Sequence, residues 1–289
     1  MNDPQKFDSY RILDTGHKCK LEQVGPYRLI RPALNAFWKP SLPAAEWEKA
    51  DGILERSSEG DGVWQWRNKL PESWLANWGG FTLKMKPTNF GHLGFFAEQY
   101  QNWNFFREFL PEVGVPELKT LNLFAYSGIG SMAMAQGGAT VTHVDAAKGM
   151  IEWGQENMLL NPRVPNKIRW IVDDVNKFCA REIRRGSKYN GIALDPPSFG
   201  RGNKGQVWKI EEHLPDLLKM CNELLDRHHP YFVVLSCHSP GFSPISLGRM
   251  LSEVFGDGKL ECGEMTVPED SGKLLPAGIS CRFIGGGKK

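Results

Sequence analysis

The strongest constraint on the fold is a regular alternation between apolar runs and helical runs from residue 118 to residue 237. The apolar runs are LKTLNLFA, ATVTHVD, IRWIVD, NGIALD and YFVVLS. Between them, helical periodicity covers residues 128–137, 147–160, 174–185 and about 210–226. Strands that are apolar on both faces are typical of parallel sheets with a helix layer on each side. The sequence therefore predicts an α/β domain built on a mostly parallel sheet.

The two ends of the chain read differently from this central region. Residues 1–83 contain short extended runs such as YRILDT, YRLIRPA and VWQWR, broken by Gly, Pro and Asp. We predict a small, mostly β domain over residues 1–83 and a catalytic domain over residues 84–289. The second domain should open with a helix that Pro111 ends, and close with one short helix and the strands KLECGEMTV and GISCRFI.

Composition limits the class of protein. The chain has 289 residues, of which 41% are hydrophobic, so it can bury a full core. It contains no apolar run of membrane-spanning length, and its start lacks the pattern of a signal peptide, so we expect a cytoplasmic protein. The six cysteines form no C-x-x-C pair, which argues against a metal site and suggests reduced thiols. The net charge of +2 permits an anionic partner, and both a monomer and a homodimer remain open.

A glycine turn and two acids suggest a nucleoside site. In LNLFAYSGIGS a strand runs into Gly128 and Gly130, where the backbone can turn tightly and approach a ligand, although a turn without a ligand is equally possible. Asp145 ends the second strand, where a carboxylate can accept both ribose hydroxyls. Asp174 follows the third strand and could accept the amine of an adenine. Each acid could instead cap the helix that follows it.

The ligand is not expected to be a dinucleotide. After Gly130 the chain lacks the third glycine that seats a pyrophosphate, which speaks against a nicotinamide oxidoreductase. An adenosine that carries a cationic sulfonium fits the glycine turn and the acids Asp145 and Asp174. In LDPPSFGRG, Pro196 and Pro197 cannot continue a strand, so they hold Asp195 at the carboxyl end of the fourth strand. There we expect Asp195 to lie beside the methyl group of the sulfonium. This is the arrangement of a class I methyltransferase.

Five motifs in order over residues 88–240 carry a resemblance to a known family. They are NFGHLGFFAEQYQNW, LNLFAYSGIGSMAMAQGGATVTHVDAAKGMIEWGQEN, DDVNKF, DPPSFGRG and LSCH. Together they resemble the S-adenosylmethionine-dependent methyltransferases related to the bacterial 23S ribosomal RNA 5-methylcytosine enzymes, in a branch without a PUA domain. The resemblance implies a Rossmann-like, seven-stranded, mostly parallel sheet, S-adenosylmethionine as cofactor and RNA as partner.

The resemblance also assigns roles to residues. Asp145 would hold the ribose, Asp174 the adenine, and Asp195 with Pro196 the methyl acceptor. The family usually has Lys and Arg where this chain has Ser198 and Tyr100, so we expect a substrate contact to have changed. The predicted cofactor-binding residues are Phe95, Gln99, Phe124, Ala125, Tyr126, Ser127, Gly128, Asp145, Ala146, Asp174, Val175 and Asp195, and the predicted catalytic residues are Asp195, Pro196 and Cys237.

The methyl acceptor depends on Cys237. Cytosine C5 is a poor nucleophile, so its methylation generally needs a thiolate that adds at C6, and the SCH motif offers Cys237 for this step. The alternative is an inert cysteine at a strand end. Nitrogen methylation, on a nucleobase or a protein amide, would use Asp195 and a proline carbonyl without a cysteine, although Ser198 replaces the usual stacking aromatic. A catalytically inactive RNA-binding or assembly protein is a further alternative.

Two surface features bear on an RNA substrate. Arg201, Lys204 and Lys209 flank the D-P-P loop, where they could contact phosphates. The N-terminal tryptophans could stack on unpaired bases, although we expect most of them to fill a thin core. They are Trp38, Trp47, Trp64, Trp66, Trp74 and Trp78.

Overall fold

The protein folds into two compact units. The structure, a computed structural model, describes residues 9–56, 62–201 and 207–286, so the predicted phosphate contact Lys204 lies outside the described residues. The first unit combines Met1–Tyr100 with Thr266–Ala277, and the second combines Gln101–Met265 with Gly278–Lys289. The domain boundary at residue 83 remains a prediction.

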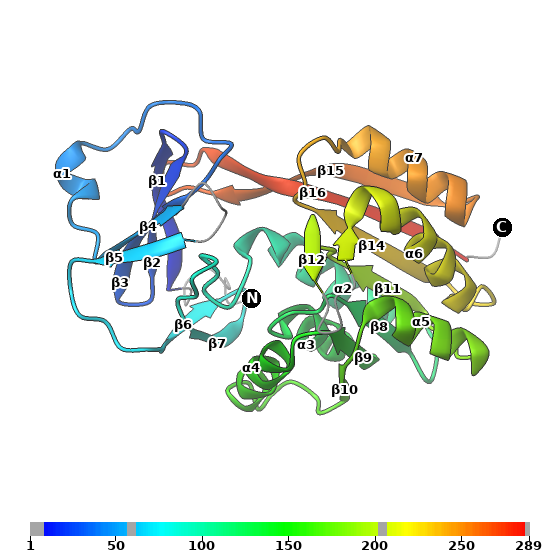
Figure 1. The fold of residues 1–289 in the computed structure, drawn as a ribbon. Coiled ribbons are helices and arrows are strands. Elements are labelled where there is room, and N and C mark those ends of the chain that lie inside the picture. The colour runs from blue at the N-terminus through cyan, green and yellow to red at the C-terminus, as the bar shows by residue number, and fades with distance from the viewer. Residues whose placement is uncertain (1–8, 57–61, 202–206, 287–289) are drawn as a thin grey trace. The chain divides into compact units, whose positions relative to one another are not determined.

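The first unit is mostly β, with a five-stranded sheet in the order β1-β2-β3-β4-β5 among its described residues (Figure 1). Its second β element is a separate antiparallel hairpin of β6 and β7. A short helix, α1 (Ala44–Trp47), lies in the connection from β3 to β4. The strands are β1 (Tyr10–Gly16), β2 (Cys19–Val24), β3 (Tyr27–Pro32), β4 (Gly52–Arg56), β5 (Gly62–Trp66), β6 (Trp74–Trp78) and β7 (Phe81–Met85).

The second unit contains the predicted α/β sheet. Within the described ranges it has seven strands in the order β10-β9-β8-β11-β14-β16-β15. The first five of these are mutually parallel, and β16 pairs antiparallel to β14. Each parallel strand has the apolar composition that double burial requires. The strands are β8 (Lys119–Leu123), β9 (Thr140–Asp145), β10 (Ile168–Val172), β11 (Gly191–Leu194), β14 (Tyr231–Cys237), β15 (Lys259–Pro268) and β16 (Leu274–Gly285).

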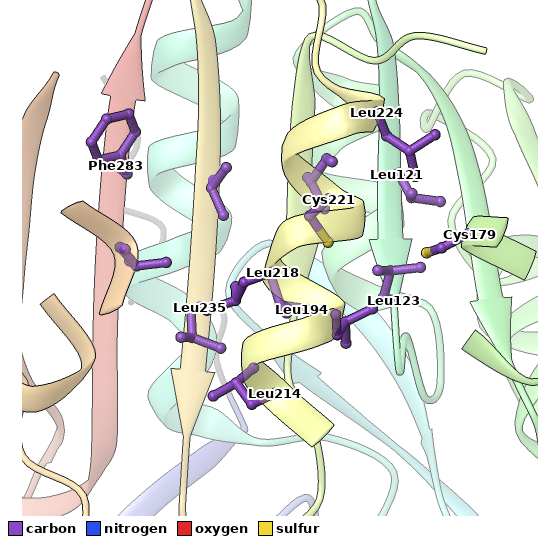
Figure 2. Packing of buried hydrophobic residues seen from close by; sticks show 14 of the residues in the cluster. Leu121, Leu123, Cys179, Leu194, Leu214, Leu218, Cys221, Leu224, Leu235 and Phe283 are labelled. Atoms are coloured by element: carbon purple, nitrogen blue, oxygen red, sulfur yellow. The ribbon is translucent and has the colours of Figure 1, made fainter. Parts of the chain in front are cut away.

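Helices connect the parallel strands and cover both faces of this sheet. On one face α5, α6 and α7 follow one another (Figure 1), and Figure 2 shows Leu214, Leu218 and Cys221 of α6 packed against the sheet. On the other face the Phe106 ring of α2 stacks on Phe232 of β14. The helices are α2 (Tyr100–Glu112), α3 (Ile129–Gln136), α4 (Lys148–Leu159), α5 (Val175–Arg184), α6 (Ile210–Leu224) and α7 (Pro244–Phe255).

Two local expectations are wrong. Pro111 does not end α2 but lies inside its last turn, where its missing N–H costs the helix a single hydrogen bond. The cysteines are not all reduced, because Cys262 and Cys281 form a disulfide. The neighbouring strands β15 and β16 bring these residues to a Cα–Cα distance of 4.1 Å, although they are 19 positions apart in the chain.

Candidate active site

The site lies at the carboxyl ends of the parallel strands, where the strand order changes direction. From β8 the chain continues to β9 on one side and later places β11 on the other, which makes this edge a topological switch point. The strand register sets Asp145, the residue after Val144 of β9, and Asp195, the residue after β11, on either side of Phe124. Asp145, Asp195 and the loop that contains Gly128 therefore lie at the same edge of this sheet.

The loop from β8 to α3 has an unusual backbone. Phe124 and Tyr126 have φ angles of 54° and 52°, which non-glycine residues rarely adopt and which cost of order 1–3 kcal/mol each. Hydrogen bonds hold this conformation: the Tyr126 N–H donates to Asp145 Oδ2 at 2.9 Å, and the Asn157 amide of α4 donates to the Ser127 carbonyl at 3.0 Å. Ala125 and Ser127 are buried in the same loop. Strain that is maintained by outside contacts is typical of ligand sites.

A buried polar network supports this loop from below. The Asn122 amide donates to Ser131 Oγ at 2.9 Å, and Ser131 Oγ lies 2.9 Å from His143 Nδ1. Burial lowers the pKa of the His143 imidazole to about 3, so the ring is neutral at pH 7. Ser131, which follows Gly130 in the turn, thus joins α3 to β8 and β9.

Two glycines let α4 and the loop approach one another. A Cβ on Gly154 would lie 2.6 Å from the Trp170 ring, and a Cβ on Gly128 would lie 2.9 Å from it. Gly128 also has a φ of 87°, in the region that favours glycine. The Trp170 ring of β10 therefore leaves no room for a side chain at either glycine.

The acids at the ends of β9 and β10 differ in their surroundings. Asp145 accepts backbone hydrogen bonds from Tyr126 and from Ala147, and burial raises the pKa of its carboxyl despite them. Asp174 is the N-cap of α5 and accepts from the Lys177 N–H at 3.0 Å. The capping role that was considered for Asp174 is therefore present, while its role toward an adenine remains a prediction. Ala146 is exposed beside Asp145, and Val175 is buried in the first turn of α5.

The acceptor side is formed by the ends of β11 and β14. Asp195 Oδ1 lies 3.5 Å from His238 Nε2. Burial raises the pKa of the Cys237 thiol, hydrogen bonds from Ser239 oppose this rise, and the negative charge of Asp195 adds to it. Ser239 also donates to Ser198 Oγ at 2.6 Å, which ties the D-P-P loop to the end of β14.

Trp208 contacts the D-P-P loop, and the sequence did not predict it as a site residue. Its indole N–H donates to the Pro197 carbonyl at 2.7 Å, and its ring centroid lies 5.1 Å from that of Phe124. The strand that carries it, β13 (Val207–Lys209), pairs with β12 (Phe199–Arg201) directly after the two prolines. Pro196 itself is buried.

Phe95 and Gln99 belong to the first unit. The Phe95 ring packs edge-on against Tyr10 at 4.9 Å, and Gln99 ends the 3-10 helix Ala97–Gln99. Their role in binding the cofactor remains a prediction.

The acidic groups of the second unit suit an adenosine that carries a sulfonium cation. Each Asp145 oxygen accepts one backbone hydrogen bond and retains lone-pair capacity for the hydroxyl groups of a ribose. Asp145 and Asp195 flank Phe124 and supply negative charge around a cationic ligand, and the helix N-terminus of α3 offers no glycine pattern for a pyrophosphate. A nucleoside that carries a positive charge matches this chemistry better than a dinucleotide does.

Comparison with known proteins agrees with this geometry. A profile of the S-adenosylmethionine-dependent methyltransferase family matches residues 74–231, and this chain belongs to that family. It is therefore an enzyme that uses S-adenosylmethionine as its methyl donor. A solved S-adenosylmethionine-dependent methyltransferase from Agrobacterium tumefaciens is 36% identical and superimposes with a TM-score of 0.88, covering 95% of this chain and 90% of that one. The fold also matches SMU.776, solved in complex with SAH, at 20% identity and a TM-score of 0.74 over 96% of this chain and 76% of that one.

Two curated relatives are named for RNA. Ribosomal RNA large subunit methyltransferase K/L of Vibrio cholerae is 38% identical over 107 residues, which are 36% of this chain and 15% of the relative. Ribosomal RNA large subunit methyltransferase I of Tolumonas auensis is 29% identical over 146 residues, which are 50% of this chain and 35% of the relative. The matches thus span about a third or less of these relatives' lengths. Over the described residues, no helix has the length and apolar character needed to span a membrane.

Proposed function

We propose that this enzyme methylates RNA, with ribosomal RNA as the first substrate to test and C5 of cytosine as the acceptor atom. The names of the curated relatives support RNA. The observation that carries the choice of C5 is that Cys237 and Asp195 lie at the carboxyl ends of the neighbouring parallel strands β14 and β11.

Each residue then has a defined task. The Cys237 thiolate bonds to C6 of the cytosine, and the displaced π electrons raise the electron density at C5. Asp195, in the form that carries a proton, donates it in a hydrogen bond to the ring nitrogen N3, which then holds part of the displaced electron density. C5 then attacks the electrophilic methyl group that S-adenosylmethionine would supply when bound, and SAH would be the other product. A base then removes the C5 proton, the electron pair restores the C5–C6 double bond, and the Cys237 thiolate is expelled. We assign this base to His238, which lies beside Asp195.

The decisive experiment is mass spectrometry of RNA nucleosides from a deletion strain. We expect one 5-methylcytidine to disappear, and to return with the wild-type gene or with Cys221→Ala but not with Cys237→Ala or Asp195→Asn. Cys221 is the matched control because it is a buried free thiol of the same core cluster, on α6. An unchanged nucleoside profile would contradict an RNA substrate.

The covalent route has a separate test. RNA that carries 5-fluorocytidine at the target should trap the enzyme, because fluorine at C5 cannot leave as a proton. We expect a protein–RNA adduct that survives denaturation and is absent in Cys237→Ala. Because burial raises the pKa of the Cys237 thiol, the methylation rate should also increase with pH in the alkaline range.

One observation favours a second candidate, methylation of an exocyclic amine. Cys237 is only 1% exposed and packs within the core cluster beneath α6 and α7, which is typical of an inert cysteine. An amine acceptor would need only Asp195 and a proline carbonyl to hold the N–H₂ group. Full activity of Cys237→Ala, with an N-methylated nucleoside as product, would select this candidate.

A further inference from the structure

A strained hairpin tip in the first unit holds one loop in a fixed position. His17 and Lys18, between β1 and β2, have φ angles of 50° and 62°, which are unfavourable for both residue types. Their N–H groups donate to the carbonyls of Trp38 and Ala36 at 2.8 and 2.7 Å, and the Lys18 carbonyl accepts from the Ala33 N–H at 2.7 Å. The tip and the loop over residues 33–38 therefore fix each other.

This loop presents aromatic rings to solvent. Phe37 is 74% exposed and Leu34 is 59% exposed, so neither contributes much to the core. The Trp38 indole N–H is anchored to Thr15, by its carbonyl at 3.1 Å and its hydroxyl at 2.9 Å, while 39% of the residue remains exposed. Lys18 Nζ lies 5.8 Å from the centre of the Phe37 ring. A fixed, exposed pair of aromatic residues beside a cation is a stacking platform.

A cavity of about 550 Å³ adjoins the platform, within the first unit. Its size falls in the range of small-molecule sites, roughly 300–1,000 Å³. Apolar walls come from residues such as Ile30, Leu42 and Trp47, and His17 and Lys39 connect it to the hairpin tip and the loop.

Charge around the cavity favours an anion. Lys39 and Arg67 line it, and Lys18 is exposed on the adjoining tip. Glu48 is the acid among the lining residues. Asp14 beneath is buried, and its oxygens accept hydrogen bonds from the N–H groups of Ser41 and Leu42 and from the Trp47 indole.

We propose that this surface binds an unpaired segment of the RNA substrate. Phe37 and Trp38 stack on successive bases, the cavity takes one base against Trp47, and Lys18, Lys39 and Arg67 contact phosphates. The inference rests on the proposed RNA substrate and adds a second contact region to it.

The first test measures the Kd of the full-length enzyme for an unstructured RNA oligomer by fluorescence anisotropy. Phe37→Ala should weaken binding about tenfold, since stacking on an aromatic ring is worth ~1–3 kcal/mol per base. Phe90→Ala is the matched control, because Phe90 is a 64% exposed phenylalanine of the same unit that does not line the cavity. Equal Kd values for the two variants would overturn the proposal.

The second test separates direct contacts with phosphates from the effect that the loss of any positive charge in the unit has on RNA binding. Lys18→Ala and Lys39→Ala should each reduce the slope of log Kd against log salt concentration by about 0.7, the value for one phosphate contact on a single strand. Lys86→Ala, an exposed lysine of the same unit outside the cavity, should leave the slope unchanged. A duplex of equal length that binds as tightly as the single strand would exclude base stacking.

The third test uses Cys19 as a reporter inside the cavity. Cys19 is partly exposed, whereas the other described free thiols, Cys179, Cys221 and Cys237, are buried. The RNA oligomer should slow alkylation of the Cys19 peptide, measured by mass spectrometry, and S-adenosylmethionine alone should not. An unchanged alkylation rate at saturating RNA would contradict the site while the enzyme still methylates RNA; absence of any RNA methylation by the wild type would instead contradict the proposed function.

Discussion

Gly154 has no room for a side chain. The helix that carries it, α4, packs its backbone against Ser127 in the loop from β8 to α3 and against the Trp170 ring. Gly149 lies on the same helix with nothing within 4 Å of an added Cβ. Alanine variants at these two positions therefore separate the effect of crowding on stability from the effect of helix propensity.

We expect Gly154→Ala to lower the free energy of unfolding by about 1–3 kcal/mol, because the new methyl group must displace Trp170 or the loop. Its affinity for S-adenosylmethionine should fall as well. Gly149→Ala should be neutral or stabilising by about 0.5–1 kcal/mol. Urea denaturation and calorimetric titration measure the two effects, and similar results for both variants would contradict the packing argument.

The proximity of Gly128 and Asp145 could be predicted from the sequence because the signals of both residues are local. Gly128 and Asp145 follow recognisable strand ends, and the structure brings them together at one edge. Asn157 and Trp208 were missed because their roles depend on partners 30 and 11 positions away, Ser127 and Pro197. A polar residue on the buried face of α4 is the only signal that could have indicated Asn157.

At the scale of elements, α7 begins with a complete capping box. Ser243 Oγ accepts from the Ser246 N–H at 3.1 Å, Ser246 Oγ accepts from the Ser243 N–H at 2.9 Å, and Pro244 occupies the first turn. These bonds satisfy helix N–H groups that would otherwise lack partners.

We expect Ser243→Ala to reduce the free energy of unfolding by about 1 kcal/mol, the usual cost of losing such a cap. Ser252→Ala, an exposed serine within the same helix, should change it by no more than a few tenths of a kcal/mol. Thermal and urea unfolding of the two variants compares them directly. Equal stability of both would show that the capping bonds do not contribute.

The strands and helices of the second unit were predictable because their periodicity is strong over whole elements. All five apolar runs are strands of one sheet, and the helices between them match within a few residues. The first unit was predicted less completely, because β2, β4, β6 and β7 span only five or six residues each and give too short a pattern to identify. Pro111 and Pro215 lie inside helices because tertiary packing outweighs the local cost of proline.

At the scale of the whole molecule, buried His143 makes stability depend on pH. Its pKa is about 3 in the folded protein, below the ordinary value of 6.5, so the unfolded chain binds a proton more readily. Above pH 6.5 this residue does not reduce the free energy of unfolding. As the pH falls from 6.5 toward 3, the free energy of unfolding decreases, because the unfolded chain takes up a proton that the folded protein does not.

Between pH 7 and pH 5, protonation of His143 in the unfolded chain should cost about 2 kcal/mol. Hydrogen exchange of β8 and β9 amides measures this loss without assuming that both units unfold together. His143→Gln should show a smaller loss over the same range, since glutamine does not titrate. An identical pH dependence in wild type and variant would contradict the assignment.

The tip between β15 and β16 belongs to the first unit, where Thr15 donates to Glu269 and the Asp270 N–H donates to the Ile12 carbonyl. During translation, the first hundred residues leave the ribosome long before this tip is made. Their unit acquires its final segment only after residue 277 has been added, so the part of the protein that is synthesised first cannot be completed until almost the whole chain has been made.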